Sequence, residues 1–287
     1  MALVSICIPT YNGATFLQEA LDSIKAQTYN NIEVIVSDDA SSDNTLSLVE
    51  KFKKEVNFPV FVYNHDPKGI GANWNNSVKK SNGDYIKFLF QDDVLMPTCI
   101  ERMVDVAKKN DNVGLVYSKR EIVYNVNDKN DTMWVKRFGS LHNHWGKLKL
   151  TEGVIDGKTY LKDPLLLEQP MNKIGEPTAV LLNKKCFDKV GYFSTQLKQT
   201  LDVEYWYRLM PYFTIAFVSE ELVKFRLHNE QATQTNKNIT TIDKQLLPKI
   251  FLKKIYFHLD KNQQKKLLKE VFIFKSIRKF FNKLKRN

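Results

Sequence analysis

Five short apolar runs alternate with helix-type patterns over the first 120 residues, and this alternation restricts the fold more than any other feature. The runs lie at 3–8, 32–36, 60–63, 85–90 and 113–117. Between them, apolar residues recur every three or four positions, which is the spacing of an amphipathic helix. We therefore predict an α/β fold in which helices flank a doubly wound sheet with mostly parallel strands.

The second half of the chain is less regular. The stretch 120–175 shows no period that predicts an element. Periodicity returns with a strand at 178–182, a helix at 202–210, and two further strands at 213–218 and 222–225. These elements extend the α/β pattern to about residue 225.

The net charge of +11 is concentrated at the C-terminal end. Residues 243–287 carry 14 basic and three acidic side chains, so residues 1–242 are electrically balanced. A balanced body gives no support to nucleic-acid binding through bulk charge. The polar stretch 229–243 is typical of a linker, which leaves 244–287 as a basic helical tail.

Several classes of protein are disfavoured by what the sequence lacks. No run of about 18 apolar residues is present, so no membrane-spanning helix is predicted. The first residues show neither the basic segment nor the cleavage site of a secretory signal. Cys7, Cys99 and Cys186 are odd in number and far apart, which predicts neither a disulfide framework nor a zinc site and fits a reducing cytoplasm.

Paired carboxylates follow two of the predicted strands, as Asp38-Asp39 and Asp92-Asp93. In open α/β sheets, ligands bind outside the carboxyl ends of the strands. Neighbouring carboxylates repel one another unless a cation or ligand donors compensate, and Mg²⁺ or Mn²⁺ prefers carboxylate and phosphate oxygens. The pairs therefore favour a cation-assisted ligand site, and the alternative is that they cap the following helices.

Three blocks, in this order and spacing, resemble the family 2 glycosyltransferases: 5–12 (SICIPTYN), 36–43 (VSDDASSD) and 83–93 (GDYIKFLFQDD). The resemblance covers about residues 3–230, with further matching blocks at 175–180, 201–209 and 226–228. It implies a GT-A type fold, which is a doubly wound mixed sheet flanked by helices. It also implies a metal-dependent, inverting transfer from a nucleotide diphosphate sugar. The catalytic domain would span 1–228, with a nucleotide-sugar half at 1–118 and an acceptor half at 119–228.

The resemblance also implies which residues bind the nucleotide sugar. The loop after the first strand would touch the nucleobase, Asp39 would accept a bond from the NH of uracil, and Asp92 would lie near the ribose. For Asn75 the alternative is an ordinary surface position on a helix, and for Arg226 a rim position. The implied set is Pro9, Thr10, Tyr11, Asn12, Asp39, Asn75, Asp92, Glu176 and Arg226.

The same resemblance implies a divalent cofactor, Mn²⁺ or Mg²⁺. Asp93 matches the last acid of the metal-binding signature. His228 matches a position that faces the metal or diphosphate in some members, and the alternative is a rim position, as for Arg226. Gln91 departs from the family pattern, which has an acid there, so the cation would have one carboxylate fewer.

Asp202 matches the catalytic base of the family. In that role it would take the proton from an acceptor hydroxyl as the hydroxyl attacks the anomeric carbon, and a single displacement would invert the configuration. The alternative is a carboxylate that only stabilises the N-terminus of a helix.

The predicted function is therefore an inverting glycosyltransferase that moves a sugar from a UDP-sugar to a hydroxyl of a glycan or lipid-linked saccharide, as in cell-surface polysaccharide synthesis. One alternative is a nucleotidyltransferase that makes nucleotide sugars, but the loop 9–13 lacks the Gly-rich, basic character that such an enzyme usually has. The other is a non-catalytic nucleotide- or membrane-binding protein, which the intact Asp39, Asp93 and Asp202 disfavour.

Apolar residues at 267–284 recur at helical spacing beside basic residues. Such a helix can lie in an anionic membrane interface. We therefore expect a cytoplasmic protein that is peripheral on the inner face of the cell membrane. The alternative is a helix that packs on the body or on a second subunit of a homo-oligomer.

Overall fold

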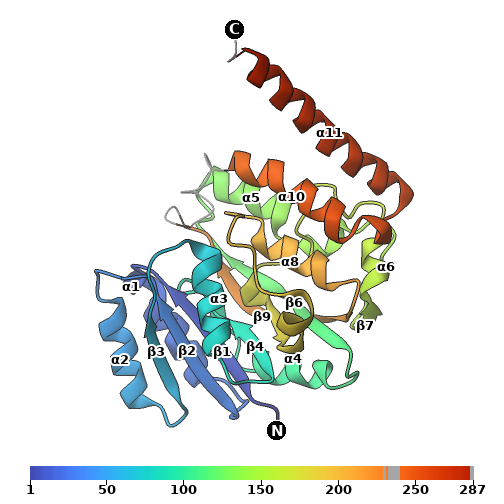
Figure 1. Cartoon of the computed structure of the whole chain (residues 1–287). Coiled ribbons are helices and arrows are strands. Elements are labelled where there is room, and N and C mark those ends of the chain that lie inside the picture. The colour runs from blue at the N-terminus through green and yellow to red at the C-terminus, as the bar shows by residue number, and fades with distance from the viewer. Residues whose placement is uncertain (229–230, 232–239, 285–287) are drawn as a thin grey trace.

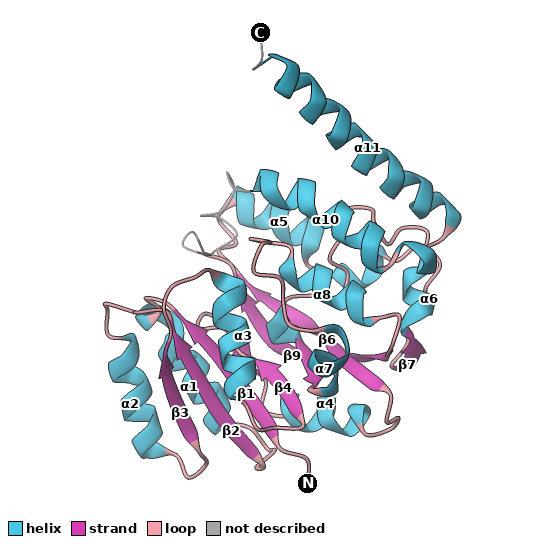
Figure 2. Cartoon of the chain, in the orientation of Figure 1, coloured by secondary structure: helices cyan, strands magenta, loops and turns pink. Residues whose placement is uncertain are grey.

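The computed structural model describes residues 1–228, 231 and 240–284, with side chains up to 272 except those of 240 and 241. A twisted sheet runs through the molecule and helices cover both of its faces (Figure 1, Figure 2). The helices α1, α2 and α4 share one apolar core with the sheet, and α3, α8 and α10 share the other.

The first half of the sheet is parallel, with the strand order β3-β2-β1-β4. β1, β2 and β4 are runs of buried residues, as expected of strands that are covered on both faces. β1 pairs with both β2 and β4, so the carboxyl ends of these strands meet at one edge. The elements of this half are β1 Val4–Thr10, α1 Ala14–Lys25, β2 Ile32–Asp38, α2 Thr45–Glu55, β3 Val60–Asn64, α3 Ile70–Lys80 and β4 Tyr85–Phe88.

The second half makes the sheet mixed. Of the eight strand pairings in the described residues, four are parallel and four antiparallel. The α/β fold is therefore confirmed, but the expectation of a mostly parallel sheet is wrong, because β8 enters antiparallel between β4 and β6. The further elements are β5 Val94–Leu95, α4 Cys99–Ala107, β6 Val113–Val123, α5 Lys129–Phe138, β7 Gly153–Asp156, α6 Gly157–Leu161, β8 Val180–Asn183, α7 Lys185–Val190, α8 Leu201–Leu209 and β9 Thr214–Arg226.

One long strand, β9, replaces the two strands predicted at 213–218 and 222–225. The exposed residues 219–221 interrupt its buried pattern. At the same place the pairing with β6 shifts its register, with Val218 opposite Ser118 and Glu221 opposite Lys119. A bulge of this kind lets pairing continue across a polar interruption, whereas the hydrophobic pattern alone indicates a break.

Side-chain caps explain why helices form in the irregular stretch 120–175. The Asp128 carboxylate accepts hydrogen bonds from the N–H groups of Asn130 and Asp131 at the start of α5. Asp156 accepts one from the N–H of Lys158 at the start of α6. No residue of α5 is fully buried, so this helix lies at the surface and adds no fully buried side chain to the apolar cores.

The C-terminal segment packs on the body. α10 (Thr240–Lys254), the residue directly after it and the first part of α11 (Lys261–Leu284) join the same core as α3 and α8, through Leu247, Phe251, Ile255 and Leu267. Each fully buried side chain of this size contributes about 1.5–3 kcal/mol. Residues 240–271 are therefore an integral part of the folded body.

The tail predicted from the sequence is thus divided. Leu267 and Val271, the first positions of its apolar stripe, are buried in the protein, while the side chains from 273 onward lie outside the described residues. Most of the predicted linker also lies outside them, but Asp243 is buried in α10. In the parts of the chain that the structure covers, no helix has the length and apolar character needed to cross a membrane.

Candidate active site

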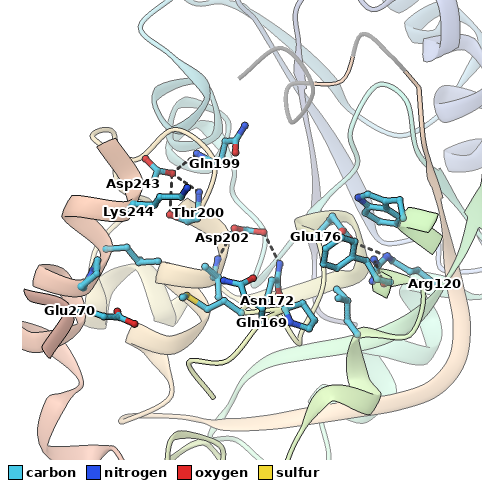
Figure 3. Close-up of a pocket in the computed structure, with 18 residues that line it drawn as sticks. Arg120, Gln169, Asn172, Glu176, Gln199, Thr200, Asp202, Asp243, Lys244 and Glu270 are labelled. Atoms are coloured by element: carbon cyan, nitrogen blue, oxygen red, sulfur yellow. Dashed lines mark hydrogen bonds and ion pairs between the residues drawn. The ribbon is translucent and has the colours of Figure 1, made fainter. Parts of the chain in front are cut away.

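Two cavities open beyond the carboxyl ends of the strands, and they meet at Asp202. The first, here called the strand-end cavity, has a volume of about 380 Å³ and lies beside the loops that follow β1, β2 and β4. The second, the helical cavity, has a volume of about 590 Å³ and lies between α5, α8, α10 and α11 (Figure 3). The residues common to both linings are Trp134, Glu176, Gln199 and Asp202.

The loop after β1 forms one wall of the strand-end cavity. Pro9, Thr10 and Tyr11 line it, as the sequence predicts for a ligand-contacting loop, and 58% of Tyr11 is exposed. Asn12 is not part of the lining. Its side chain accepts a hydrogen bond from the N–H of Ser42 at 2.8 Å, so it ties this loop to the one after β2.

Gln91 holds the same loop in place. The N–H of Tyr11 donates to Gln91 Oε1 at 3.0 Å, and Gln91 Nε2 donates to the carbonyl of Tyr11 at 3.1 Å. Gly13 makes room for this contact, since a Cβ there would lie 2.2 Å from Gln91 Oε1. The amide at this position thus binds the backbone through both of its polar atoms, which a carboxylate could not do because it has no N–H to donate.

The carboxylates after β2 have separate tasks. Asp38 is buried and accepts hydrogen bonds from the Thr10 and Ser41 hydroxyl groups, so it shapes the loops. Asp39 lines the strand-end cavity and lies 2.5 Å from His65 Nδ1. Burial raises the pKa of Asp39, and the His65 contact lowers it in part. Asp39 is therefore the acid of this pair that can accept a ligand N–H.

The carboxylates after β4 are divided in the same way. Asp92 lines the cavity with His228, and their Oδ2 and Nε2 atoms are 2.9 Å apart. Asp93 is buried, and its two oxygens accept hydrogen bonds from Thr178 Oγ1 at 2.6 Å and from the N–H of Arg226 at 3.2 Å. Burial, reinforced by the charge of Asp92, holds the pKa of Asp93 well above its usual range. The structure therefore brings Asp92 and His228 to the cavity, and it does not bring Asp93 there.

Arg226 also lies outside the cavity lining. Its Nε donates to the carbonyl of Asp92 at 3.2 Å, its guanidinium stacks 4.8 Å from the centre of the Phe16 ring, and it forms an ion pair with Glu19. Arg226 thus stabilises the turn that contains Asp92 and Asp93, on the side away from the cavity lining. The resemblance implied that Arg226 binds the nucleotide sugar, with a rim position as the alternative. A strand pattern does not show which neighbour a long side chain will reach.

Asn75 and Asn73 differ from expectation. Asn75 is buried and exchanges two 2.9 Å hydrogen bonds with the backbone of Phe193, so it fastens α3 to a distant loop. It is not a surface residue, and it is not part of the lining of the strand-end cavity. Asn73, one helical half-turn earlier, lines the strand-end cavity. Its Oδ1 has no hydrogen-bond partner within the described residues. The sequence places three asparagines on this helix, Asn73, Asn75 and Asn76, and does not tell which of them faces the cavity.

Asp202 begins the first turn of α8, where both cavities reach it. Its Oδ2 accepts a 2.8 Å hydrogen bond from Asn172 Nδ2, and its Oδ1 accepts a 2.7 Å bond from the N–H of Val203. Burial, with a smaller contribution from the charge of Glu176, raises the pKa of Asp202 to about 7. Glu176 itself lies 2.9 Å from the Arg120 guanidinium. A carboxylate with such a pKa can take up a proton near neutral pH.

Asn172 and Asp243 are site residues that the sequence did not reveal. Asn172 orients Asp202, as described above (Figure 3). The buried Asp243 carboxylate accepts hydrogen bonds from the N–H groups of Lys198, Gln199 and Thr200 at 2.7–2.9 Å. It thereby fixes the loop that leads into Asp202. Its only sequence signal was an acidic residue in a polar stretch.

The donor set at Asp92 and His228 fits a divalent cation that is shared with a ligand. A carboxylate oxygen and an imidazole nitrogen at this spacing can both face one ion, and Mg²⁺ or Mn²⁺ commonly takes one or two protein ligands together with phosphate oxygens and water. Within the described residues, no cluster of three or more histidine, cysteine or acidic side chains is arranged to hold a metal without such a ligand.

Comparison with known proteins gives a consistent result. The model of glycosyl transferase family 2 matches residues 5–166. An uncharacterized glycosyltransferase of Rickettsia typhi is 31% identical over 237 residues, which cover 82% of this chain and 67% of the relative. This chain thus spans about two thirds of that relative's length.

Solved structures share the fold at low sequence identity. The complex of S. aureus TarS 1-349 with UDP-GlcNAc has a TM-score of 0.67 at 18% identity, over 95% of this chain and 72% of that one. A mannosyltransferase from Pyrobaculum calidifontis, in complex with GDP-Man and Mn²⁺, has a TM-score of 0.59 at 18% identity, over 87% of this chain and 63% of that one.

Proposed function

The chain belongs to glycosyl transferase family 2, and we propose that it transfers a sugar from a UDP-sugar to a saccharide hydroxyl with inversion at the anomeric carbon. The observation that carries this proposal is the position of Asp202, which lines both cavities and is oriented by Asn172. A base at the junction can reach a donor in one cavity and an acceptor in the other. Family membership favours this reaction over a nucleotidyltransferase or a non-catalytic binding protein.

The strand-end cavity is the proposed donor site. The exposed Tyr11 ring can stack on a nucleobase, and the Asp39 carboxylate can accept the imide N–H of uracil. Asn73, whose buried Oδ1 lacks a partner among the described residues, can accept a further ligand N–H or hydroxyl. Similar proteins have been crystallised with UDP-GlcNAc and with GDP-Man, so GDP is the natural comparison in a binding test.

The reaction follows from these positions. The acceptor oxygen forms a bond to the anomeric carbon, while the bond from that carbon to the diphosphate oxygen breaks and its electron pair leaves with UDP. Asp202 takes the proton of the attacking hydroxyl. Glu176, the other carboxylate shared by the cavities, is ion-paired with Arg120, which leaves it less suited to act as a nucleophile. A single displacement, and hence inversion, is the pathway that this arrangement supports.

Asp92 and His228 are the residues that would hold a divalent cation, Mn²⁺ or Mg²⁺, together with the diphosphate. When bound, such a cation compensates the negative charge of the leaving diphosphate. Metal binding, which the resemblance implied for Asp93, is assigned in this proposal to Asp92. Asp93, buried behind it, positions the turn through Thr178 and Arg226.

The C-terminal residues 273–287 extend the proposal to the membrane. They contain Lys275, Arg278, Lys279, Lys283, Lys285 and Arg286 and no acidic residue. A basic segment of this kind is attracted to anionic lipid by about 1 kcal/mol per residue near the surface. We propose that it brings the body to a lipid-linked saccharide acceptor, as in the synthesis of a cell-surface polysaccharide.

Calorimetry with UDP and GDP, with and without MnCl₂, tests the donor assignment. UDP should bind more tightly than GDP, and Mn²⁺ should strengthen binding in the wild type but not in Asp92→Asn. Asp202→Asn should keep UDP affinity near the wild-type value while hydrolysis of the preferred UDP-sugar falls by about 10²–10⁴-fold, as is typical when a general base is lost. The proposal would be contradicted if Asp202→Asn hydrolysed the UDP-sugar at the wild-type rate. It would also be contradicted if Mn²⁺ did not change the affinity of the wild type for UDP.

A further inference from the structure

The helical cavity is larger than the strand-end cavity, and the C-terminal helices close it. Lys244, Leu247 and Pro248 of α10 and Glu270 of α11 form one side, and Gln169–Asn172 and α5 form the other. Asp202 lies between these walls (Figure 3). A cavity of about 590 Å³ is within the range of pockets that bury ligands of drug-like size, roughly 300–1,000 Å³. It therefore has room for more than a single sugar ring.

The lining combines flat apolar surfaces with hydrogen-bonding edges. Trp134 and Phe138 are neighbours with ring centres 5.2 Å apart, and Trp134 reaches both cavities. Gln169, Thr200 and Lys244 add polar groups around them. A sugar ring has the matching character, since its C–H face is apolar and its hydroxyl groups lie around the edge.

The charges of the lining disfavour an anion. Four acidic side chains, Glu176, Asp202, Asp243 and Glu270, face two basic ones, Arg120 and Lys244. Of the two basic groups, the Arg120 guanidinium is already paired with Glu176 and stacks 5.9 Å from the Trp134 ring centre. A phosphate or carboxylate brought into this cavity would meet a net negative lining, with Lys244 as its main cationic partner. Its binding is disfavoured because the anion would lose its hydration without enough positive charge to compensate.

These features point to one class of acceptor. We infer that the helical cavity binds the acceptor as the uncharged end of an oligosaccharide, at least two sugar units long, with its terminal ring between Trp134 and Asp202. This inference rests on the proposed function, because it needs a donor sugar in the strand-end cavity. In this inference, the C-terminal helices α10 and α11 form one wall of the acceptor site, although the sequence presents them as a tail.

The test uses the full-length protein and the UDP-sugar that it hydrolyses fastest. Matched acceptors are oligosaccharides of two to four units that end in a neutral hexose or N-acetylhexosamine, or in the corresponding uronic acid or 6-phosphate. Transfer should favour the neutral member of a pair by on the order of tenfold or more, which corresponds to about 1.4 kcal/mol. Faster transfer to the charged members, or none to any member while hydrolysis continues, would overturn the assignment.

Two variants locate the effect. Glu270→Lys changes the charge of the cavity wall and should reduce the preference for neutral acceptors several-fold, whereas Glu50→Lys makes the same change on the exposed face of α2 and should not alter it. Gln169→Trp places a bulky ring in the cavity at an exposed position. It should abolish transfer to oligosaccharides while hydrolysis of the UDP-sugar continues, since water can still reach Asp202.

The outcomes separate this inference from the proposed function. If the wild type binds no UDP and hydrolyses no UDP-sugar, the proposed function fails, and the acceptor assignment fails with it. If binding and hydrolysis are normal but Gln169→Trp transfers like the wild type, only the acceptor assignment fails. An equal change of preference in Glu270→Lys and Glu50→Lys would likewise refute the role of the cavity lining.

Discussion

Replacement of Asp202 by asparagine should change the pH dependence of stability as well as activity. The folded-state pKa of Asp202 is about 7, against an ordinary value of 3.8, because the carboxylate is buried. Between these values the unfolded chain binds fewer protons at this site than the folded protein does, so the free energy of unfolding falls as pH rises. Below pH 4 the group is protonated in both states and this effect disappears.

The magnitude follows from linkage. Each pH unit in this window is worth 1.36 kcal/mol for a full proton, so between pH 5 and pH 8 the wild type should lose up to about 2.7 kcal/mol relative to a neutral residue. Because the Asp202 residue is partly exposed to solvent, which screens part of this effect, we expect about 1–2 kcal/mol. Asp202→Asn loses part of a hydrogen-bond pair, at about 0.5–1.5 kcal/mol, but that loss is the same at every pH.

Urea unfolding at pH 5, 6, 7 and 8 measures the effect. The stability of Asp202→Asn minus that of the wild type should rise from pH 5 to pH 7 and level off towards pH 8, where the variant should be the more stable protein. Asp66→Asn, on an exposed loop, is the matched control and should show a constant difference. A difference between Asp202→Asn and wild type that stays constant or falls with pH would refute the reasoning, including the assignment of Asp202 as a base tuned by burial.

Further predictions follow from the other contacts of the site. Hydrolysis of the UDP-sugar should decline below about pH 7 as Asp202 is protonated. In a rate profile, Asn172→Ala should shift this decline to higher pH, because the Asn172 amide stabilises the Asp202 carboxylate. A shift to lower pH would contradict this role of Asn172. Gln91→Ala should weaken UDP binding by about fivefold in calorimetry, the equivalent of one hydrogen bond, through a loosened Tyr11 loop, whereas unchanged affinity would exclude that role. Asp243→Ala should lower the free energy of unfolding by about 2–4 kcal/mol, since it leaves three backbone N–H groups without their acceptor, and Asp260→Ala, at the start of α11, should cost less than half as much. Deletion of 273–287 should abolish flotation with anionic vesicles at low salt and leave UDP binding intact; flotation of both proteins alike would argue against the membrane role.

Local pattern predicted part of the lining of the cavity that we propose as the donor site. Buried strands that end in acidic residues appear in the sequence as apolar runs followed by carboxylates, and Asp39 and Asp92, at two such ends, line the strand-end cavity. The pattern could not decide which of two adjacent carboxylates faces the cavity and which one is buried. Asp92 and Asp93 are adjacent, and only the surrounding elements decide that Thr178 and Arg226 take Asp93 into the interior.

The C-terminal helices show the opposite case, in which the local pattern does not determine what a helix packs against. The sequence indicates an amphipathic helix, but an apolar stripe is equally satisfied by lipid, by a second subunit or by the protein's own core. Tertiary packing decides between them for α10 and for α11 as far as Val271, because α8 and its neighbours offer a complementary apolar surface that these helices cover.

By itself, then, the sequence determined the α/β class and, through short blocks that resemble it, the family. It also predicted the strand ends and the position of Asp202 on which the proposed site depends, since each of these is a short run of neighbouring residues. The tertiary structure decided which carboxylate of each pair faces the cavity. It also decided that Asn172 contacts Asp202 and that Asp243 binds the backbone of a loop 43 residues before it in the chain. It also decided that α10 and α11 wall the helical cavity. These features join segments that are distant in sequence, and no local pattern encodes a contact that exists only after the chain has folded.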